Sequence, residues 1–316
     1  MRKNPIKSLA VLSLVSLIPV LHGATAEVTK SGSNFIVRVD GVQTLSTPSY
    51  SAALQNAAGT GNRVMNVRVE GNNWTGQVQM RASSSFNYLT SSISDSSTAN
   101  ASIYGYKSGG LSVNGLRLRA RTAYGILFSS CATPRFDNVG LDHQNGGTVV
   151  SFRIDSQGST RTTGCYARNV RPSNLASGDR QGFETYAIDG YDISGVTGTS
   201  IGGCGLLIND GRSGKVGSTN TNTCGKGTTY AGLRWANNCD NATASSATDV
   251  SSSRGIFILN STRITVTTCN LRSNPVDSIW IQNGSNNRVN GGTVRGPRRP
   301  VITSSSGSVI NVSYSP

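Results

Sequence analysis

The stretch GIFILNSTRITVTTC, residues 255–269, decides the fold because the same design recurs along the chain. It opens with a small residue, continues with alternating apolar positions, reaches an asparagine and then begins a more polar strand. Four other stretches share this design and start at Gly182, Gly205, Gly232 and Ser278. In chain order the five starts lie 23, 27, 23 and 23 residues apart. A repeat of this length built from short strands is typical of a solenoid, and its strand content indicates a parallel β-helix.

Two columns of the repeat are predicted to face the core. The first holds Phe183, Leu206, Leu233, Ile256 and Ile279, and the second holds Thr185, Ile208, Trp235, Ile258 and Ile281. Side chains alternate between the two faces of a strand, so positions two apart share a face. The following turn carries a third column: Asp210, Asn237, Asn260 and Asn283. We expect these side chains to form a hydrogen-bonded ladder that caps the strand ends.

Further coils precede the five aligned ones. GILFSSCATPRFDNVGL begins at Gly125, and TVVSFRIDSQGSTRTTGC, residues 148–165, is interpreted as the coil that follows it. The one segment with helical character is SYSAALQNAA, residues 49–58. The sequence therefore predicts an all-β, single-domain protein with coils of about 23 residues and a short helix near its N-terminus.

The first 26 residues have the design of a secretory signal peptide. MRKNPIK is a basic region, SLAVLSLVSLIPVL is an apolar region too short for a membrane span, and ATA fits a small-residue cleavage site. We therefore expect a signal peptide at 1–26 and a β-helix domain at 27–316. The protein is expected to be secreted into the extracellular space, with no membrane partner.

Six cysteines follow the predicted cleavage site: Cys131, Cys165, Cys204, Cys224, Cys239 and Cys269. An even number of cysteines in an exported protein predicts disulfide bonds, although the pairing is not determined. The same part of the chain holds a single histidine, His143, and no CxxC pair. We therefore assign no metal site built from histidine and cysteine. The cofactor is unknown, and the sequence does not require calcium.

Charge favours an acidic partner. The chain holds 29 Lys and Arg against 15 Asp and Glu, a formal net charge of +14, and loss of the predicted signal peptide lowers it to +11. The basic residues are scattered, with one tight group in RGPRRP at 295–300. Nucleic-acid binding usually requires basic clusters with aromatic residues between them. An acidic polysaccharide is therefore the expected partner of a monomeric protein, and nucleic acid is not.

The coil spacing and the asparagine column resemble those of the pectate-lyase-like right-handed β-helix superfamily. The resemblance covers residues 59–316, and 49–58 resembles the N-terminal cap helix of such folds. Members of this superfamily are mostly secreted enzymes that act on polysaccharides, and the resemblance implies the same here. The chain lacks the WIDH and Arg-x-Pro-x-x-Arg sequences of calcium pectate lyases and the GHG and RIK sequences of polygalacturonases. Both of those activities are therefore disfavoured.

A cluster of acids marks the candidate site. GDRQGFETYAIDGYD, residues 178–192, holds four of the 15 acids of the chain. Asp189 and Asp192 lie in a turn sequence and are interpreted as structural, whereas Asp179 is left undecided. The outward columns of the aligned strands are predicted to be Glu184, Leu207, Arg234, Phe257 and Trp280, followed by Tyr186, Asn209, Ala236, Leu259 and Gln282. Glu184 is therefore the acid expected in a groove.

These outward residues suit β-elimination on a uronate. Arg234 and Asn209 would neutralise the substrate carboxylate, which stabilises the enolate-like intermediate. Tyr186 or Lys226 would exchange protons with the sugar, and His143 is an alternative base. Glu184 would orient Arg234 or hold a cation. Further contacts with the substrate are assigned to Asp210, Arg180, Trp280 and Phe257.

Two other functions stay open at the level of sequence. A glycoside hydrolase would pair Glu184 with Asp210 or Asp179 across a glycosidic bond. Asp210 occupies the column that is asparagine in the next three coils, so a capping role explains it more readily. A non-catalytic glycan-binding β-helix would use Trp280, Phe257 and Arg234 as a contact surface, because exposed aromatic side chains tend to mark binding sites.

Overall fold

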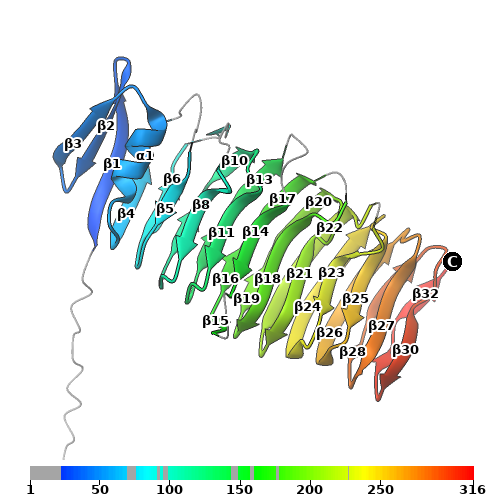
Figure 1. Cartoon of the computed structure of the whole chain (residues 1–316). Coiled ribbons are helices and arrows are strands. Elements are labelled where there is room, and N and C mark those ends of the chain that lie inside the picture. The colour runs from blue at the N-terminus through cyan, green and yellow to red at the C-terminus, as the bar shows by residue number, and fades with distance from the viewer. Residues whose placement is uncertain are drawn as a thin grey trace, which may run out of the picture.

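The chain forms a right-handed parallel β-helix, as predicted (Figure 1). This computed structural model describes residues 23–69, 76–90, 93–94, 99–143, 149–156, 160–175, 178–226 and 228–316. Most of the predicted signal peptide lies outside the described residues. Three parallel sheets run the length of the solenoid, and each coil contributes one strand or part of a strand to each sheet.

Sheet 1 carries the aligned strands of the repeat. Its strands, in spatial order, are β5 (Val78–Met80), β8 (Ala101–Tyr106), β11 (Tyr124–Ser129), β14 (Val150–Asp155), β18 (Gln181–Asp189), β21 (Leu206–Arg212), β23 (Ala231–Ala236), β25 (Arg254–Leu259), β27 (Asp277–Ser285) and β30 (Val301–Ser306). The short strand β15 (Thr162–Thr163) also pairs with the end of β18.

Sheets 2 and 3 complete each coil. Sheet 2 comprises β4 (Arg63–Val67), β6 (Ser85–Tyr88), β9 (Ser112–Asn114), β12 (Arg135–Asp137), β16 (Tyr166–Arg168), β19 (Asp192–Ser194), β22 (Lys215–Cys224), β24 (Asp240–Val250), β26 (Thr262–Arg272), β28 (Arg288–Val289) and β31 (Val309–Ile310). Sheet 3 comprises β7 (Ile93–Ser94), β10 (Arg117–Ala120), β13 (Gly140–His143), β17 (Arg171–Leu175), β20 (Val196–Ile201), the second halves of β22, β24 and β26, β29 (Gly292–Arg295) and β32 (Ser313–Ser315).

The two predicted core columns are confirmed. All ten side chains are at most 1 % exposed, and each pairs in register with its counterpart in the next coil. Trp235 is among the largest fully buried side chains, and its Nε1 donates a hydrogen bond to the Tyr191 hydroxyl at 3.1 Å. Apolar burial along these columns is the main favourable term that holds the coils together.

The Asp/Asn turn column has a different physical basis from the one predicted. All four residues of the column have a positive φ, between 47° and 55°: Asp210, Asn237, Asn260 and Asn283. Left-handed backbone conformations favour asparagine and aspartate over other non-glycine residues, which explains the column. An amide ladder exists elsewhere, in sheet 2. There Asn87 Nδ2 donates to Asn66 Oδ1 at 3.0 Å, and Asn114 Nδ2 donates to Asn87 Oδ1 at 2.7 Å.

The prediction of disulfide bonds is wrong for this structure, which describes all six cysteines as free and buried. They fill small apolar positions instead. Cys204 packs with Leu207 and Ala236, whereas Cys239 belongs to the central core. Burial raises the pKa of the Cys204 and Cys239 thiols to about 11, so both are protonated, unreactive core residues.

The N-terminal end of the core is covered by a helix, as predicted. Helix α1 (Tyr50–Ala58) begins after Ser49, whose Oγ accepts a hydrogen bond from the Ala52 amide at 3.2 Å, and it ends at Gly59. Its buried face joins the core of the solenoid. Beside it lie three strands that the sequence did not predict: β1 (Ala24–Ser31), β2 (Asn34–Val39) and β3 (Val42–Thr47). They pair antiparallel with one another, and β1 joins β4.

Strand β1 begins at Ala24, so the predicted cleavage sequence ATA forms its first three residues. In the described part of the chain, no helix has the length and apolar character needed to cross a bilayer.

The leading glycine of the repeat is a steric requirement that can be tested at Gly232. A Cβ atom at this position would lie 2.1 Å from Thr221 Oγ1 and 2.4 Å from Asp249 Oδ1. These two buried groups share a hydrogen bond of 2.6 Å. We expect Gly232→Ala to lower the free energy of unfolding by about 2–4 kcal/mol through overpacking and a displaced hydrogen bond. Chemical denaturation followed by circular dichroism measures the change.

The matched control is Ser245→Ala, on the exposed face of β24. That variant should stay within about 0.5 kcal/mol of the wild type. Equal stability of the two variants would contradict the steric explanation of the glycine column.

Candidate functional site

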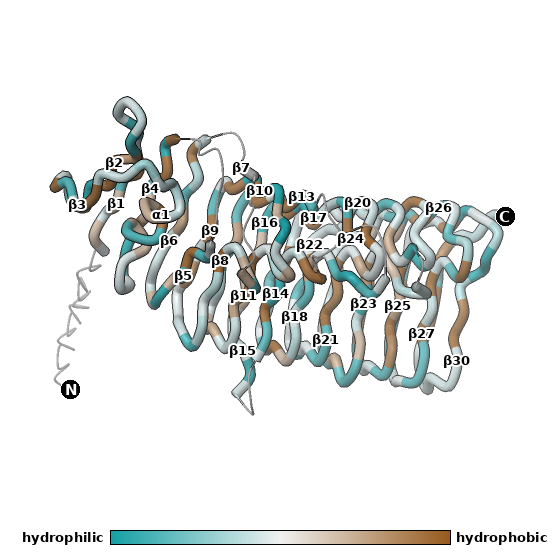
Figure 2. The backbone as a smooth tube through the Cα atoms, turned by 45° about the horizontal axis from the view of Figure 1, so that its top comes forward, coloured by the Kyte–Doolittle hydropathy of each residue, from teal (hydrophilic) through white to brown (hydrophobic). Residues whose placement is uncertain are grey.

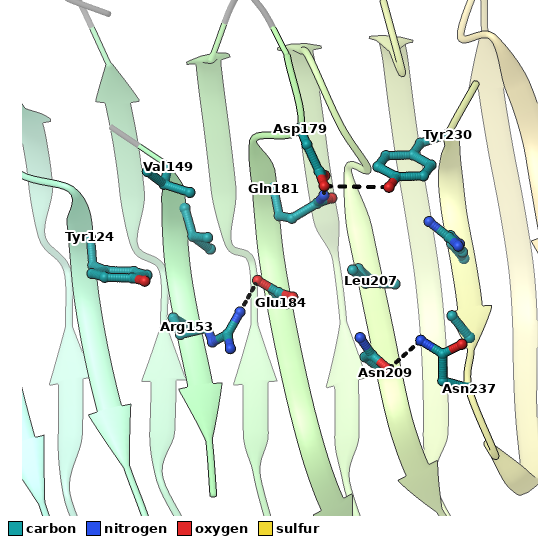
Figure 3. Close-up of a pocket in the computed structure, with 13 residues that line it drawn as sticks. Tyr124, Val149, Arg153, Asp179, Gln181, Glu184, Leu207, Asn209, Tyr230 and Asn237 are labelled. Carbon is teal, nitrogen blue, oxygen red and sulfur yellow. Dashed lines mark hydrogen bonds and ion pairs between the residues drawn. The ribbon is translucent and has the colours of Figure 1, made fainter. Parts of the chain in front are cut away.

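A polar pocket of about 250 Å³ lies on the outer face of sheet 1, over the middle coils (Figure 3). Its lining residues come from five neighbouring strands, β11, β14, β18, β21 and β23, and from the adjoining loops: Tyr124, Val149, Val150, Arg153, Asp179, Gln181, Glu184, Leu207, Asn209, Tyr230, Arg234, Ala236 and Asn237. Three of the residues predicted from sequence are therefore brought together here: Glu184, Arg234 and Asn209. Asp179, which the sequence left undecided, joins them.

Strand register brings the charged residues into one row. Arg153 of β14 pairs with Glu184 of β18, which pairs with Leu207 of β21 and then with Arg234 of β23. Neighbouring strands lie about 4.8 Å apart, so Glu184 and Arg234 are separated by about 10 Å of backbone. This row confirms the predicted outward column.

Glu184 is held by an arginine that sequence reasoning missed. Arg153 Nη1 lies 2.5 Å from Glu184 Oε2, as Figure 3 shows, and Arg153 Nε lies 3.2 Å from Asp155 Oδ2. The predicted pairing of Glu184 with Arg234 is therefore replaced by one with Arg153. The signal was present, because extending the outward column one coil toward the N-terminus reaches Arg153 in the stretch 148–165.

Burial gives Glu184 an unusual carboxyl group. The residue is 6 % exposed, and burial raises the pKa of its carboxyl above the ordinary value. The charge and hydrogen bond of Arg153 pull this pKa back down, while the negative charges of Asp179 and Asp155 add smaller upward contributions. A carboxylate with a raised pKa and a fixed position is suited to proton transfer.

A hydrogen-bonded group of three residues forms the rim. Gln181 Nε2 donates to Asp179 Oδ1, and its Oε1 accepts from the Cys204 amide at 2.6 Å. The Tyr230 hydroxyl donates to Asp179 Oδ2 at 3.3 Å (Figure 3). Tyr230 directly precedes β23, whereas Asp179 lies in the loop before β18. The loop carboxylate is thus held from two sides, and it orients the Tyr230 phenol at the pocket.

Arg234 presents a guanidinium with no carboxylate partner. It is 8 % exposed and lies between two rings, 4.3 Å from the centroid of Tyr230 and 4.9 Å from that of Phe257. Within the described residues it forms no ion pair, and its Nε has no hydrogen-bond partner. The two rings fix the plane of the guanidinium by cation–π contacts. An anion entering the pocket would find an arranged, uncompensated positive group.

Amide groups close the other end of the pocket. Asn237 Nδ2 donates to Asn209 Oδ1 at 3.1 Å, which leaves Asn209 Nδ2 as a donor for a ligand (Figure 3). Asn209 was predicted from its outward column, whereas Asn237 was assigned only to the turn column.

The aromatic surface predicted at Phe257 and Trp280 is wrong for Phe257, which is only 4 % exposed. Its ring stacks on Trp280 with centroids 4.8 Å apart, and the Arg254 guanidinium lies over both rings. Trp280 is half-buried and donates from Nε1 to Thr303 Oγ1 at 2.9 Å. Neither ring lines the pocket. Guanidinium groups lie over both rings, where a sugar would stack.

The other residues predicted for proton transfer, and Arg180, which was predicted to contact the substrate, lie outside the pocket lining. His143 is 3 % exposed and its Nε2 is 2.7 Å from Ser151 Oγ. Tyr186 is 43 % exposed, with the Arg153 guanidinium 5.5 Å from its ring centroid. Lys226 is exposed and Arg180 is half-buried. None of these four lines the pocket, although Tyr186 neighbours Asn209 across the strand pairing.

Asp210 is a structural residue rather than a substrate contact. Its Oδ2 lies 2.6 Å from Arg161 Nη1, and Arg161 Nε lies 2.8 Å from Asp189 Oδ1. Asp192 pairs with Arg168 at 2.7 Å. The structural interpretation of Asp189 and Asp192 is therefore consistent with their ion pairs. Of the four clustered acids, two stabilise coil corners and two face the pocket.

The described residues contain no group of three His, Cys, Asp or Glu side chains arranged to hold a metal ion.

No protein-family model matches the sequence, and neither does any curated protein. Several solved structures resemble the fold. An alginate lyase from Paenibacillus sp. str. FPU-7 is 14 % identical, with 83 % of this chain and 97 % of that chain covered and a TM-score of 0.49. A GH136 lacto-N-biosidase from Eubacterium ramulus is 10 % identical, with 87 % and 65 % covered and a TM-score of 0.48.

Another similar structure is the A-module of the mannuronan C-5 epimerase AlgE6 from Azotobacter vinelandii. It is 12 % identical, with 84 % of this chain and 92 % of that chain covered and a TM-score of 0.48. These likenesses concern the fold alone.

The position of His143 inside the coil predicts a pH-dependent contribution to stability. Burial lowers the pKa of its imidazole to about 4, from an ordinary value of 6.5. In the unfolded chain the imidazole of His143 therefore becomes protonated below about pH 6.5. In the folded chain it becomes protonated only below about pH 4. This histidine should cost up to about 3 kcal/mol of stability as the pH falls from 7 to 4.

The test compares the free energy of unfolding of the wild type and His143→Gln across this pH range. Glutamine can keep a hydrogen bond to Ser151 but does not titrate. The variant should therefore gain relative stability toward pH 4. A difference that does not change with pH would show that His143 is not buried as a neutral group.

Proposed function

We propose that this protein cleaves a uronate-containing polysaccharide by β-elimination in the pocket of sheet 1. The observation that carries the proposal is Arg234, a buried guanidinium held between two rings and lacking a carboxylate partner within the described residues. A buried cation of this kind is costly unless an anion compensates it. The substrate carboxylate supplies that anion.

Carboxylate binding prepares the substrate for loss of its C5 proton. In this proposal the uronate carboxylate accepts hydrogen bonds from the Arg234 guanidinium and from Asn209 Nδ2. Removal of the C5 proton moves negative charge onto the carboxylate oxygens. Donors already aimed at those oxygens stabilise the developing charge without reorganising, which is the largest contribution to many enzymatic rate enhancements.

Glu184 and Tyr230 supply the two proton transfers. Glu184 is kept ionised by Arg153 and takes the proton from C5, so the C5–H electron pair forms the C4–C5 double bond. The C4–O4 bond breaks with its electron pair on oxygen. The Tyr230 hydroxyl turns its O–H from Asp179 to that oxygen and donates its proton. Both residues return to their starting states by proton exchange with water. Tyr230 replaces the predicted Tyr186 and Lys226 because it lines the pocket and they do not.

A second candidate function is supported by the two carboxylates in the pocket. Glu184 is buried and has a raised pKa, whereas Asp179 is exposed at the rim. Two carboxyl groups in contrasting environments are the arrangement that a glycoside hydrolase uses for its acid and its base. This alternative leaves the unpaired Arg234 without a function, which is why elimination is the first proposal.

The test of the proposal is Arg234→Ala, assayed on acidic polysaccharides by ultraviolet absorbance of unsaturated product ends. We expect kcat/KM to fall by about 10²-fold or more, the loss typical of removing one charge-stabilising donor. Arg234→Lys keeps the charge but not the planar fork, so its activity should lie between those of the wild type and the alanine variant.

The control is Arg288→Ala, which removes an exposed arginine from sheet 2 and should leave turnover unchanged. Circular dichroism confirms that each variant is folded. Wild-type turnover by a folded Arg234→Ala protein would remove Arg234 from the mechanism and with it the case for elimination.

A further inference from the structure

Sheet 3 carries a second recess, of about 240 Å³, on a different face from the pocket. It lies over β10, β13 and β17, whereas the pocket lies over sheet 1. Figure 2 labels β10, β13 and β17 along one side of the solenoid and β11, β14, β18 and β21 along another. The residues around this recess take no part in the proposed elimination.

Three arginines converge on the recess around a glycine. Arg117, Gly140 and Arg171 pair directly across the three strands, and Arg119 lies two positions beyond Arg117. Because Gly140 has no side chain, the surface of the sheet is low between Arg117 and Arg171. The Arg117 side chain crosses this gap, since a Cβ atom at Gly140 would lie 2.9 Å from Arg117 Cδ.

The positive charge in the recess is uncompensated. Within the described residues, none of Arg117, Arg119 and Arg171 forms an ion pair. Burial lowers the pKa of the Arg117 guanidinium, and the nearby charge of Arg171 lowers it further. Asp142 is the one acid in the lining, and it accepts hydrogen bonds from Asn174 Nδ2 at 2.6 Å and Ser173 Oγ at 3.4 Å.

The local backbone fixes Arg117 in place. Its Nη1 donates to the carbonyl oxygens of Asn138 at 2.5 Å and Leu116 at 3.2 Å, and its Nη2 donates to Asn138 Oδ1 at 2.9 Å. Arg119 and Arg171 are exposed. The recess therefore combines one arranged guanidinium with two that can close on a ligand in the bidentate manner that suits carboxylates.

The surface beyond the recess carries neutral hydrogen-bonding groups. The row that begins with Arg117, Gly140 and Arg171 continues in register through Thr197, Asn220, Thr248 and Asn270. Hydroxyl and amide side chains match the hydroxyl groups of a sugar chain, whereas a small inorganic anion would need none of them. This row extends the recess into a strip along the solenoid.

We propose that the recess and its strip form a second, non-catalytic site for an acidic polysaccharide, whose carboxylates bind among Arg117, Arg119 and Arg171. The choice of uronate-containing glycan rests on the proposed function of the pocket. The second site would hold a long substrate against the protein while the pocket on sheet 1 acts on another part of the same chain, which raises the effective concentration of substrate.

The test measures binding rather than turnover, in an Arg234→Ala background that disables the pocket. Affinity electrophoresis through gels containing polygalacturonate, alginate or neutral dextran gives the dissociation constants. We expect the background protein to be retarded in an acidic gel and not in dextran. Adding Arg119→Gln and Arg171→Gln should weaken this binding about tenfold, because charged hydrogen bonds are lost. Gly140→Ala should weaken binding too, since the added methyl group would displace the Arg117 side chain without changing the charge.

The matched control adds Arg212→Gln and Arg288→Gln, which remove the same charge from exposed positions outside sheet 3. Equal weakening by the control pair would overturn the proposal, because it would show attraction by net charge alone. Competition by inorganic phosphate or sulfate, with no dependence of glycan binding on the recess arginines, would also overturn it.

These outcomes separate the two proposals. If the wild type shows no turnover but the recess variants lose binding, the second site stands and the elimination fails. If the wild type turns over an acidic glycan but substitution of the recess arginines does not change glycan binding, only the proposal of a second site is contradicted.

Discussion

In-register stacking of parallel strands is the constraint on which the rest of the structure depends. Each residue of sheet 1 lies directly beside its counterpart in the next coil, about 4.8 Å away. The inward columns are therefore apolar in all the aligned coils except at Thr185, while the outward columns place chemically different groups side by side. Arg153, Glu184 and Arg234 come from positions far apart in the sequence, yet they form one row because of this register.

Arginine has three distinct functions in this molecule, and they are separated by the partners it finds. Arg161 pairs with Asp189 and Asp210 and stabilises a coil corner. Arg153 pairs with a buried carboxylate and fixes its position. Arg234, with no acid partner in the described part of the chain, is the group that the proposed elimination uses to bind the substrate carboxylate. The presence or absence of a carboxylate partner therefore distinguishes the structural arginines from the candidate binding group.

Sequence reasoning reached the fold because the constraint that governs it is periodic. Spacing and alternation located both core columns, the helix near the N-terminus and the outward positions of Glu184 and Arg234. It failed where the answer depends on neighbours that do not recur. The outward position of Phe257 was right but its exposure was not, since guanidinium groups cover its ring. The link between Arg153 and Glu184 spans 31 residues rather than about 23, so Arg153 is found only by extending the outward column beyond the five aligned coils. The cysteines were misjudged because an even count says nothing about whether two thiols meet.

The most direct test of the account is a panel of polysaccharides incubated with the purified protein and followed by two signals together. Ultraviolet absorbance reports unsaturated ends, and a reducing-sugar assay reports every chain break. The account predicts that both signals rise together on a uronate-containing glycan and that neither rises on neutral glycans. New reducing ends without absorbance would contradict elimination and turn attention to Glu184 and Asp179 as the carboxylate pair of a hydrolase.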